Sequence, residues 1–424
     1  MMKKYDSYKD SGLPWLGNIP IHWKMVRINN LLEESKKKSV DGHEQSLSLS
    51  KSSGVIPYEE KENRTMQSES LIGAKIVEPG DVVFNRFKAR LFATSGYHGV
   101  VSPDYAVYKG KGVADLNYLV FLFGTEHYRA AFDRKASGIG DGFSRLYTKD
   151  LFSMYSIIPP LEEQKKIVDF LNKEITLIET CKWQRERELQ ALNELRQAEI
   201  ANVITRGLNP TVPMKDSGIP WIGQIPAHWN TMRIRGLFKE SDEKTTDETG
   251  TLLSLSQYTG ITKKTDAGKT GMFEAESTVG YKIVHPGQFV MNIMLAWNGS
   301  YAVSDLEGII SPAYCVFDFR INCNKKYFDY LLRTKAYCGA FKTQSRGIID
   351  SRLRLYPYKF YSFKTLVPPI EEQNAIVEYI ESKTNKIDAM IEALKSEIER
   401  LSEYKQRLIS DVVTGQINVQ EETA

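Results

Sequence analysis

The chain is an internal duplication, and this feature constrains its fold more than any other. Three segments of the first half return in the same order in the second half, at offsets of 206, 207 and 209: residues 9–23 as 215–229, 75–80 as 282–287, and 159–164 as 368–373. Matched segments in one order at a nearly constant spacing indicate a repeated structural unit. A chain of 424 residues is long enough for several domains that each bury a core. We therefore expect two copies of one structural plan.

Within each half, the character of the sequence changes at a Pro-Pro step. Short apolar runs punctuated by glycine and proline come before it, such as residues 82–84 (VVF), and they are typical of strands in a mixed domain. After it, Pro160 and Pro369 suit the first position of a helix, and the glutamates that follow suit its positive end. More than 40 residues without glycine or proline then run to Thr205 and to Thr414. The predicted fold class is α+β (mixed), with two pseudo-repeated globular α/β domains joined by two long helices.

The second long helix carries an apolar repeat with alternating spacings of four and three residues, in which Lys405 is the one polar interruption. The repeat comprises Ile387, Ile391, Leu394, Ile398, Leu401, Leu408 and Val412. In the first long helix, Lys182 and Arg185 fall on the corresponding register. Its apolar members are Ile175, Ile178, Leu189, Leu192 and Val203. The spacing predicts a coiled-coil seam. We expect the two helices to pack antiparallel on each other; two unrelated surface helices are the alternative.

These patterns predict four segments. They are a first globular domain with its N-terminal docking segment at 1–158, a central long helix at 159–208, a second domain with its docking segment at 209–367, and a C-terminal long helix and tail at 368–424. Each docking segment is extended, rich in glycine and proline, and carries two tryptophans. We expect these tryptophans to dock the segment onto a helix or a globular domain. They are Trp15, Trp23, Trp221 and Trp229.

The net charge of +3 conceals an asymmetry between the globular and helical parts. Residues 24–158 carry a net charge of +3 and residues 230–367 carry +6, whereas residues 159–229 carry −1 and residues 368–424 carry −6. This distribution suits globular domains that meet a polyanion and helices that meet a different partner.

Two near-matches to catalytic motifs share the segment 102–105 (SPDY). It resembles the motif with which amino-methyltransferases hold a target amine, but it lacks a second proline, and no convincing cofactor-binding loop accompanies it. Asp104 with residues 133–135 (DRK) also mimics the carboxylate and lysine pattern of metal-dependent nucleases. The second half has Ala313 and Lys342 in place of the two aspartates. A self-sufficient nuclease or adenine methyltransferase therefore stays open as an alternative function.

The sequence suggests no other chemistry. Its six histidines are scattered, and its four cysteines have no zinc-finger spacing, so we expect free thiols. We assign no catalytic, cofactor-binding or metal-ligating residue. The first residues are followed by no apolar stretch, and no apolar run approaches the ~18 residues of a membrane span. We expect a cytoplasmic protein that has no membrane partner.

Comparison of the two halves indicates where the globular domains differ within their shared plan. After the shared Asn85, the first half carries Arg86, Lys88 and Arg90. Alternate residues of an extended segment share one face, and these side chains suit phosphate oxygens and guanine edges. We predict that all three contact DNA; the alternative is that they are solvated or packed strand residues.

The second half presents different side chains at the equivalent place. Asn292 and Asn298 suit adenine edges, and Trp297 suits an apolar or stacking contact, so we predict that these three contact DNA. Three arginines precede the Pro-Pro steps and complete the predicted contacts: Arg145, Arg352 and Arg354. Because Arg145 and Arg354 are shared between the halves, we expect them to contact the DNA backbone rather than to distinguish bases.

The repeated segments resemble those of a known family. The opening at 10–23 (DSGLPWLGNIPIHW), the helix start at 159–164 (PPLEEQ) and their repetition resemble the specificity subunits of type I restriction-modification systems, over essentially the whole chain. The resemblance implies two target-recognition domains joined by two long helices that form an antiparallel coiled coil. Each domain would read one half of an asymmetric, interrupted DNA site.

The resemblance also implies partners and cofactors. The partners would be double-stranded DNA, two methyltransferase subunits that methylate adenine, and ATP-driven restriction subunits. The chain itself would be non-catalytic and hold no cofactor, since S-adenosylmethionine, ATP and Mg²⁺ would be used by the partner subunits. Two domains on long helices of roughly 60 Å would read only sites of matching spacing, near one turn of duplex (~34 Å). A coiled-coil structural tether without sequence preference is a further alternative.

Overall fold

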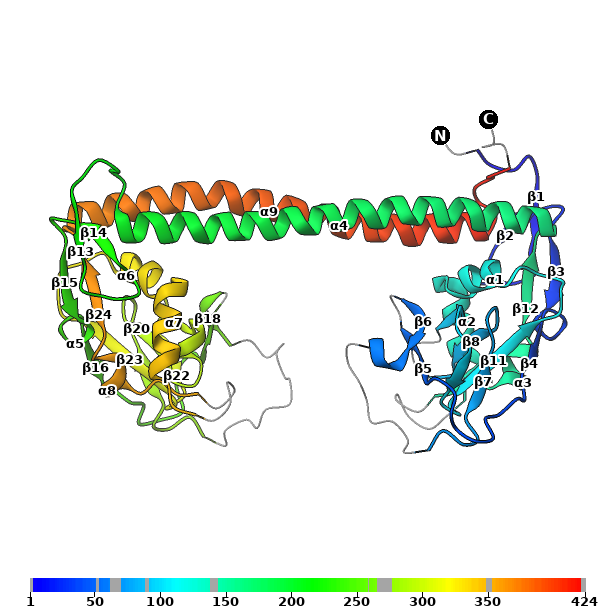
Figure 1. Cartoon of the computed structure of the whole chain (residues 1–424), viewed down its shortest axis with the longest axis horizontal. Helices are drawn as coiled ribbons and strands as arrows, with labels where there is room; N and C mark the ends of the chain where they lie inside the picture. Colours follow the sequence, from blue (N-terminus) through cyan, green and yellow to red (C-terminus); the bar gives the residue numbers. More distant parts are fainter. Residues whose placement is uncertain are drawn as a thin grey trace. The chain divides into compact units, whose positions relative to one another are not determined.

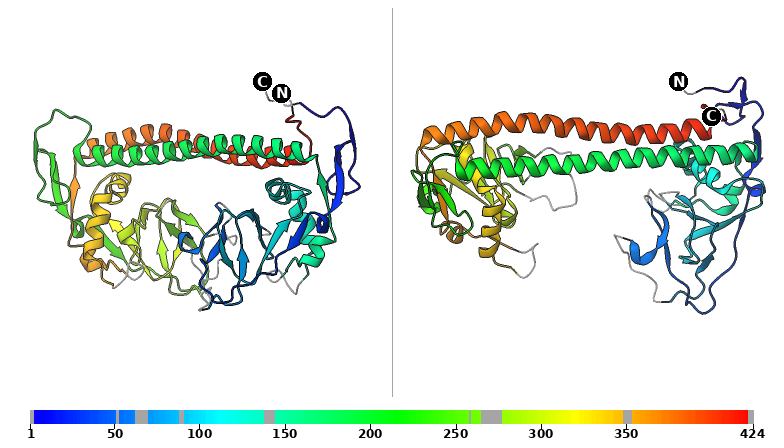
Figure 2. Two further views of the ribbon diagram at one scale, coloured as in Figure 1. Left: turned by 45° about the vertical axis from the view of Figure 1, so that its right-hand side comes forward. Right: turned by 45° about the horizontal axis from the view of Figure 1, so that its top comes forward.

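The computed structural model describes residues 3–50, 53–61, 70–87, 91–137, 144–257, 259–264, 277–347 and 353–420. The chain divides into two compact units, Met1–Glu186 with Ser396–Ala424, and Arg187–Lys395. Each unit contains one globular head and a segment of each long helix (Figures 1 and 2). We call residues 24–158 the first head and residues 230–367 the second head.

The first unit begins with a strand pair and continues into the first head. Its elements are β1 (Tyr8–Asp10), β2 (Asn18–Pro20), β3 (Lys24–Arg27), η1 (Ile28–Asn30), β4 (Leu32–Glu34), β5 (Leu47–Ser50), β6 (Gly54–Pro57), η2 (Tyr58–Glu60), β7 (Lys75–Val77), β8 (Val82–Asn85), β9 (Phe92–Thr94), β10 (Gly99–Val101), β11 (Tyr105–Gly110), α1 (Leu116–Phe123), α2 (Glu126–Lys135), α3 (Thr148–Phe152) and β12 (Tyr155–Ile158).

The second unit follows the same order of strands and main helices. Its elements are β13 (Met214–Asp216), β14 (Gln224–Pro226), β15 (Asn230–Arg233), α5 (Ile234–Leu237), β16 (Phe238–Ser241), β17 (Leu253–Ser256), β18 (Gly260–Lys263), β19 (Lys282–Val284), β20 (Phe289–Asn292), η4 (Ala296–Asn298), β21 (Tyr301–Val303), β22 (Gly308–Ile310), β23 (Tyr314–Phe319), α6 (Lys325–Leu332), α7 (Lys335–Gln344), α8 (Pro357–Phe360) and β24 (Lys364–Val367).

A four-stranded antiparallel sheet lies at the centre of each head. Its strand order is β4-β11-β8-β9 in the first head and β16-β23-β20-β21 in the second. In the first sheet Asn85 lies opposite Tyr105, and in the second Asn292 lies opposite Tyr314. Equivalent residues therefore pair in the same register, which confirms that each half of the sequence folds by one plan.

The apolar runs of these strands are explained by burial on both faces of the sheet. In β8, Val82 and Phe84 belong to the larger core of the first head, where α1 and α2 pack. Val83 faces the other way and belongs to a smaller core with Leu47 and Val107. Because successive side chains of a strand point to opposite faces, a strand buried on both sides needs consecutive apolar residues.

The two long helices are α4 (Leu161–Arg206) and α9 (Ile370–Val413), as the sequence predicts. They lie side by side and antiparallel (Figures 1 and 2). In the first unit Glu179 pairs with Lys405 at 2.6 Å, and Arg185 pairs with Glu397 at 3.0 Å. In the second unit Arg196 of α4 pairs with Asp388 of α9 at 2.8 Å. Partner numbers on α9 fall as those on α4 rise, so the predicted antiparallel packing is confirmed.

Cross-helix ion pairs explain the polar residues on the predicted seam. Arg185 reaches a carboxylate on α9, and the seam residue Lys405 reaches one on α4. Lys182 lies 4.0 Å from Glu179, the carboxylate that also binds Lys405. The apolar seam residues Ile391 and Leu408 are buried. The charges therefore interrupt the apolar pattern without interrupting the packing.

One glutamate at the start of each long helix holds the docking segment. Glu163 accepts hydrogen bonds from Trp23 Nε1 at 3.0 Å and from the Tyr5 hydroxyl at 2.6 Å, and it pairs with His22 Nε2 at 2.8 Å. The burial of Tyr5 and the neighbouring Glu163 carboxylate both raise the pKa of Tyr5. These contacts join the repeated His-Trp pair to the second glutamate of the repeated PPLEEQ motif.

The second unit repeats this arrangement. Glu372 pairs with His228 at 2.5 Å and accepts from Trp229 Nε1 at 2.9 Å. The other two tryptophans contact the heads. Trp15 lies edge-on to Tyr128, with ring centroids 4.8 Å apart, and a similar edge-on contact joins Trp221 and Tyr337. The predicted docking role of the tryptophans is confirmed.

The glutamine of the same motif joins the helix start to the head. Gln164 donates to the Pro159 carbonyl at 2.8 Å and accepts from the backbone N–H of Asp115 at 2.7 Å. Asp115 in turn caps α1 through its side chain. Gln373 and Asn324 repeat these contacts in the second unit. The motif thus fixes where each long helix leaves its head.

The C-terminal end of each long helix also packs on a head. The Tyr118 hydroxyl donates to the Val413 carbonyl at 3.1 Å in the first unit, and the Tyr327 hydroxyl donates to the Ile204 carbonyl at 2.9 Å in the second. Gly415 follows α9 with a φ of +77° and lies against Pro20 and Trp23. Each head is therefore held by the start of one long helix and the end of the other.

Candidate nucleic-acid interface

In each head, a backbone hydrogen bond joins the segment after one sheet strand, β8 or β20, to the segment that carries an arginine shared by both halves. In the first head the N–H of Leu146 donates to the Arg86 carbonyl at 3.0 Å, and Arg145 forms a β-bridge with Ser137. In the second head the N–H of Leu355 donates to the Ile293 carbonyl at 2.8 Å. The structure therefore joins two regions that the sequence analysis treats separately.

Arg145 is held at this site by two contacts. Its Nη2 atom lies 3.5 Å from Asp104 Oδ1, and its guanidinium carbon lies 4.4 Å from the ring centroid of Phe87. The side chain remains 43% exposed. A guanidinium carries five N–H donors, so an exposed one stacked on an aromatic ring can still bind a phosphate. The predicted DNA contact of Arg145 suits this geometry and stays a prediction.

Arg86, a predicted DNA contact, has a largely buried side chain. Its Nη2 atom donates to Glu34 at 2.6 Å and to the Thr148 hydroxyl at 3.2 Å, and the side chain is 18% exposed. Lys75 also binds Glu34, and both its burial and the nearby Arg86 charge lower the pKa of Lys75. Arg86 thus has a structural role in the first head. Lys88, Arg90 and Arg352 lie outside the described residues, so their DNA contacts stay predictions.

The asparagine shared by both heads closes a turn. Asn85 Oδ1 accepts from the backbone N–H of Phe87 at 2.9 Å, and Asn292 Oδ1 accepts from that of Met294 at 3.0 Å. Asn292 is 4% exposed. Such local bonds explain why asparagine is the last residue of the strand in both halves. The base contact of Asn292 stays a prediction.

The other predicted residues of the second head lie nearer the surface. Trp297 Nε1 donates to the Met294 carbonyl at 3.1 Å, and Lys342 Nζ lies 4.8 Å from the centroid of its ring. Asn298 is exposed. The exposed Arg354 has its Nη2 atom 4.0 Å from Met294 Sδ, at the position where Arg145 meets Phe87 in the first head. Arg354, Trp297 and Asn298 thus lie around one turn, and their DNA contacts stay predictions.

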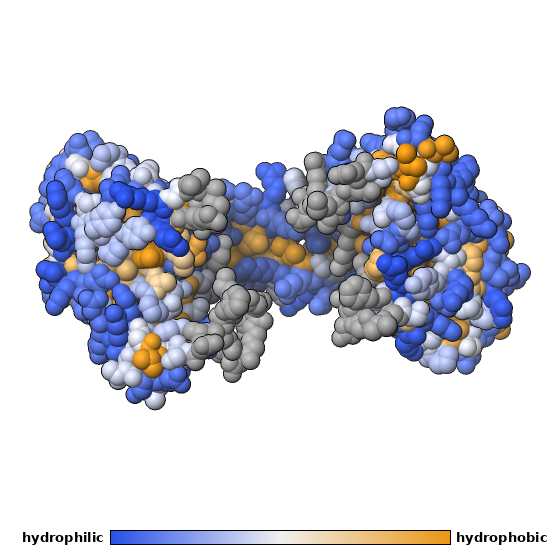
Figure 3. All heavy atoms as spheres, turned by 90° about the horizontal axis from the view of Figure 1, so that it is seen from below, coloured by the Kyte–Doolittle hydropathy of each residue, from blue (hydrophilic) through white to orange (hydrophobic). Residues whose placement is uncertain are grey.

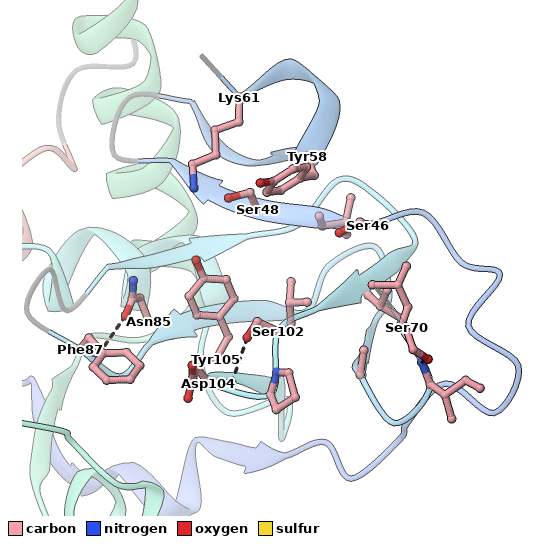
Figure 4. Close-up of a pocket in the computed structure, with 17 residues that line it drawn as sticks. Ser46, Ser48, Tyr58, Lys61, Ser70, Asn85, Phe87, Ser102, Asp104 and Tyr105 are labelled. Atoms are coloured by element: carbon pink, nitrogen blue, oxygen red, sulfur yellow. Dashed lines mark hydrogen bonds between the residues drawn. The ribbon is translucent and has the colours of Figure 1, made fainter. Parts of the chain in front are cut away.

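A cavity of about 400 Å³ opens beside Arg145 in the first head (Figure 4). Its lining includes Tyr58 and Lys61 on one side, and Phe87, Asp104 and Tyr105 on the other. Sequence reasoning missed Tyr58, Lys61 and Tyr105 as site residues. The SPDY motif was the available signal, but it points to catalysis when read alone.

Metal sites and membrane-spanning helices were both sought among the described residues. Across the residues that the structure describes, no group of three or more His, Cys, Asp and Glu side chains is arranged to hold a metal ion. In the same residues, no helix is long and apolar enough to cross a membrane.

Sequence comparisons find a known domain in this chain and two similar proteins. Residues 20–191 match the family model described as the type I restriction modification DNA specificity domain. The type I restriction enzyme MjaVIII specificity subunit of Methanocaldococcus jannaschii is 25% identical over 306 residues, which cover 67% of this chain and 67% of that protein. The MjaX specificity subunit of that organism is 24% identical over 289 residues, which cover 62% of this chain and 59% of that protein.

Solved structures share the fold. One chain from a structure of the assembly and conformational transition of the type I R-M system aligns with a TM-score of 0.66 and 16% identity, covering 94% of this chain and 99% of that one. The HsdS subunit from Thermoanaerobacter tengcongensis aligns with a TM-score of 0.50 and 15% identity, covering 96% and 100%. Duplicated heads on paired helices, with the matched domain, define a class of DNA-specificity proteins. Residues 20–191 are similar to the DNA specificity domain, and about two thirds of the chain is similar to specificity subunits of type I restriction enzymes.

Proposed function

We propose that this chain is the DNA sequence-recognition subunit of a type I restriction-modification complex, in which each head reads one half of an asymmetric bipartite site. The observation that carries the proposal is that the two heads share one backbone plan but differ in chemistry at one equivalent place. Phe87 and Asp104 of the first head correspond to Met294 and Ala313 of the second. A common scaffold with different side chains at one place suits two readers of different sequences.

The charge of the heads supports contact with a polyanion. Both heads carry a positive formal charge, and the long helices carry a negative one. On the face shown in Figure 3, the surface of each head is mostly hydrophilic, with small apolar patches. Phosphate contacts supply most of the affinity of such proteins for DNA, whereas base contacts supply the specificity.

The long helices would dock the methyltransferase subunits, and the restriction subunits would join that complex. Large apolar or aromatic side chains are exposed on both helices and would be available to such partners. On α4 these are Leu177, Trp183 and Leu195, and on α9 they are Met390 and Tyr404, each 46–57% exposed. The length of the helices would set the spacing between the two half-sites.

In this proposal the chain itself carries out no chemistry. S-adenosylmethionine would be used by the methyltransferase subunits, and ATP and Mg²⁺ by the restriction subunits. The purified chain should therefore leave DNA unchanged when it is supplied with Mg²⁺ or with S-adenosylmethionine, and DNA cleavage or methylation by the chain alone would refute this part of the proposal.

An exchange of one head tests the two-reader proposal. Residues 230–367 would be replaced by the equivalent head of a relative, and adenine methylation would be mapped after co-expression with the methyltransferase subunit. The expected result is a motif in which one half changes and the other is retained. A change in both halves, or in neither, would contradict the proposal.

A further inference from the structure

The SPDY motif of the first head has a role that the fold alone does not require. Residues 102–105 form a turn between β10 and β11 that lines the cavity beside Arg145 (Figure 4). The backbone N–H of Tyr105 donates to the Ser102 carbonyl at 3.0 Å, which holds the turn. The cavity volume of about 400 Å³ is within the range of small-molecule binding sites.

The walls of the cavity suit a flat ring. Tyr58, Phe87 and Tyr105 contribute aromatic side chains from three separate parts of the head, and each is partly buried. Burial raises the pKa of Tyr105, although a hydrogen bond to Ser48 opposes the shift. Bases stack on aromatic side chains, so these rings favour a nucleobase over an aliphatic ligand.

The polar groups define which edge of a ring would fit. Asp104 is 53% exposed at the rim, and its carboxylate can only accept hydrogen bonds. Asn85 uses its Oδ1 atom to accept from Phe87, so it meets a ligand with its NH₂ group. A carboxylate that only accepts complements an exocyclic amino group, which adenine, cytosine and guanine all carry.

A cation at the rim suits the phosphate of a nucleotide. Arg145 touches two lining residues, Asp104 at 3.5 Å and the Phe87 ring at 4.4 Å, and its side chain is 43% exposed. The carboxylate therefore orients a guanidinium beside the cavity. A phosphate bound there would place the attached base near the aromatic walls.

The second head keeps the frame of this site but not its ligand-facing groups. Tyr58 and Lys264 make the equivalent backbone bond, to the Ser46 and Leu252 carbonyls, so lysine replaces the tyrosine. Met294 replaces Phe87, and Ala313 replaces Asp104. The shared residues of the motif explain the turn, and the differing ones give the two heads different chemistry at this place.

We propose that this cavity binds one nucleotide of the DNA, whose base carries an exocyclic amino group, and that Asp104 accepts a hydrogen bond from that amino group. The proposal rests on the proposed function and names a specificity-determining residue within it. The SPDY motif would thus hold an amine without modifying it.

A double-mutant cycle between protein and DNA tests the proposal. The full chain in complex with its methyltransferase subunits would be titrated with duplexes carrying its methylated motif. In these duplexes each adenine, cytosine or guanine of one half-site is replaced in turn by purine, pyrimidin-2-one or hypoxanthine, which lack the amino group. We expect one replacement to weaken binding about tenfold in the wild type and by less than twofold in Asp104→Ala.

The variants and outcomes separate this proposal from the proposed function. Asp104→Ala introduces the alanine that the second head has naturally, so the fold should be retained, and Phe87→Met imports Met294 in the same way. Glu33→Ala removes another exposed carboxylate of the first head and should behave as wild type.

Equal losses in wild type and Asp104→Ala at every position would overturn the cavity proposal alone. A wild-type complex that binds its motif no better than a scrambled duplex would overturn both.

Discussion

Trp23 donates its indole N–H to Glu163 at 3.0 Å, across 140 residues of sequence. This bond explains at once why the His-Trp pair and the Pro-Pro-x-Glu-Glu-Gln helix start are both repeated. Each motif is one side of a contact that fixes a docking segment against the start of a long helix. The same bond between Trp229 and Glu372 in the second unit shows that the contact belongs to the shared plan.

Loss of this carboxylate should destabilise the first unit. Glu163 has a side chain that is 6% exposed and binds three partners, so Glu163→Ala would leave the buried Trp23 N–H without its acceptor. We expect a loss of about 3 kcal/mol in the free energy of unfolding, measured by urea denaturation. Glu162→Ala is the matched control, since that neighbouring side chain is 80% exposed. Equal effects of the two substitutions would contradict the role assigned to Glu163.

The glycine after α9 should tolerate no side chain. A Cβ atom at Gly415 would overlap Pro20, whereas one at Gly112 would meet nothing within 4 Å, and both residues have a φ near +75°. Gly112→Ala should therefore cost only the backbone strain of about 1 kcal/mol, and Gly415→Ala should cost clearly more. Thermal unfolding of the two variants would measure the difference. Matching melting temperatures would contradict the close packing at the end of α9.

A buried thiol should make stability fall at alkaline pH. Burial raises the pKa of Cys315 to about 12, with a further contribution from the charge of Glu240. In the unfolded chain a cysteine ionises near pH ~8.5, so between these values the folded state binds more protons. The contribution of the thiol to stability is thus complete below pH ~8.5 and falls by about 1.4 kcal/mol per pH unit above it. Urea denaturation at pH 8, 9 and 10 should show the stability of wild type relative to Cys315→Ala decreasing. A constant difference would contradict the burial of this thiol.

The salt dependence of DNA binding should show which basic residues of the first head contact phosphate. Arg145→Ala should reduce the slope of log K against log salt by about 1, because it removes one phosphate contact. Lys88→Ala with Arg90→Ala should reduce it by about 2, as the sequence predicts for both residues. Arg86 is left unchanged in this test because its ion pair with Glu34 supports the fold. Lys173→Ala on α4, an exposed lysine outside the heads, should not change the slope. An unaltered slope for Arg145→Ala would place this residue away from the DNA.

The architecture was predictable because its signals are repeated or local. The paired motifs reveal the duplication, and long segments without glycine or proline reveal α4 and α9. The polar residues Lys182 and Arg185 obscure the seam in sequence; Lys182 lies near Glu179 one turn away on the same helix, whereas the partner of Arg185 is Glu397 on the other helix and no local pattern indicates it. Contacts such as Tyr118 with Val413 join residues 295 positions apart, and no local pattern encodes them.

The candidate site was less predictable for a related reason. Identity between the halves shows that Asn85 and Asn292 matter, but it does not separate a turn residue from a base reader, and the structure gives both a turn bond. The cavity is lined from the β5–β6 region, the end of β8 and the β10–β11 turn. These segments lie in separate sheets that meet through a shared apolar core, so residues such as Tyr58 carried no functional signal in the sequence.

The central claim is that two heads of one chain read two different half-sites, and a methylome tests it most directly. The chain would be co-expressed with its methyltransferase subunit in a host without adenine methylation, and modified adenines would be mapped by long-read sequencing. The account predicts one interrupted, asymmetric motif with one adenine modified on each strand. A continuous motif, or methylation without sequence preference by a folded complex, would contradict it.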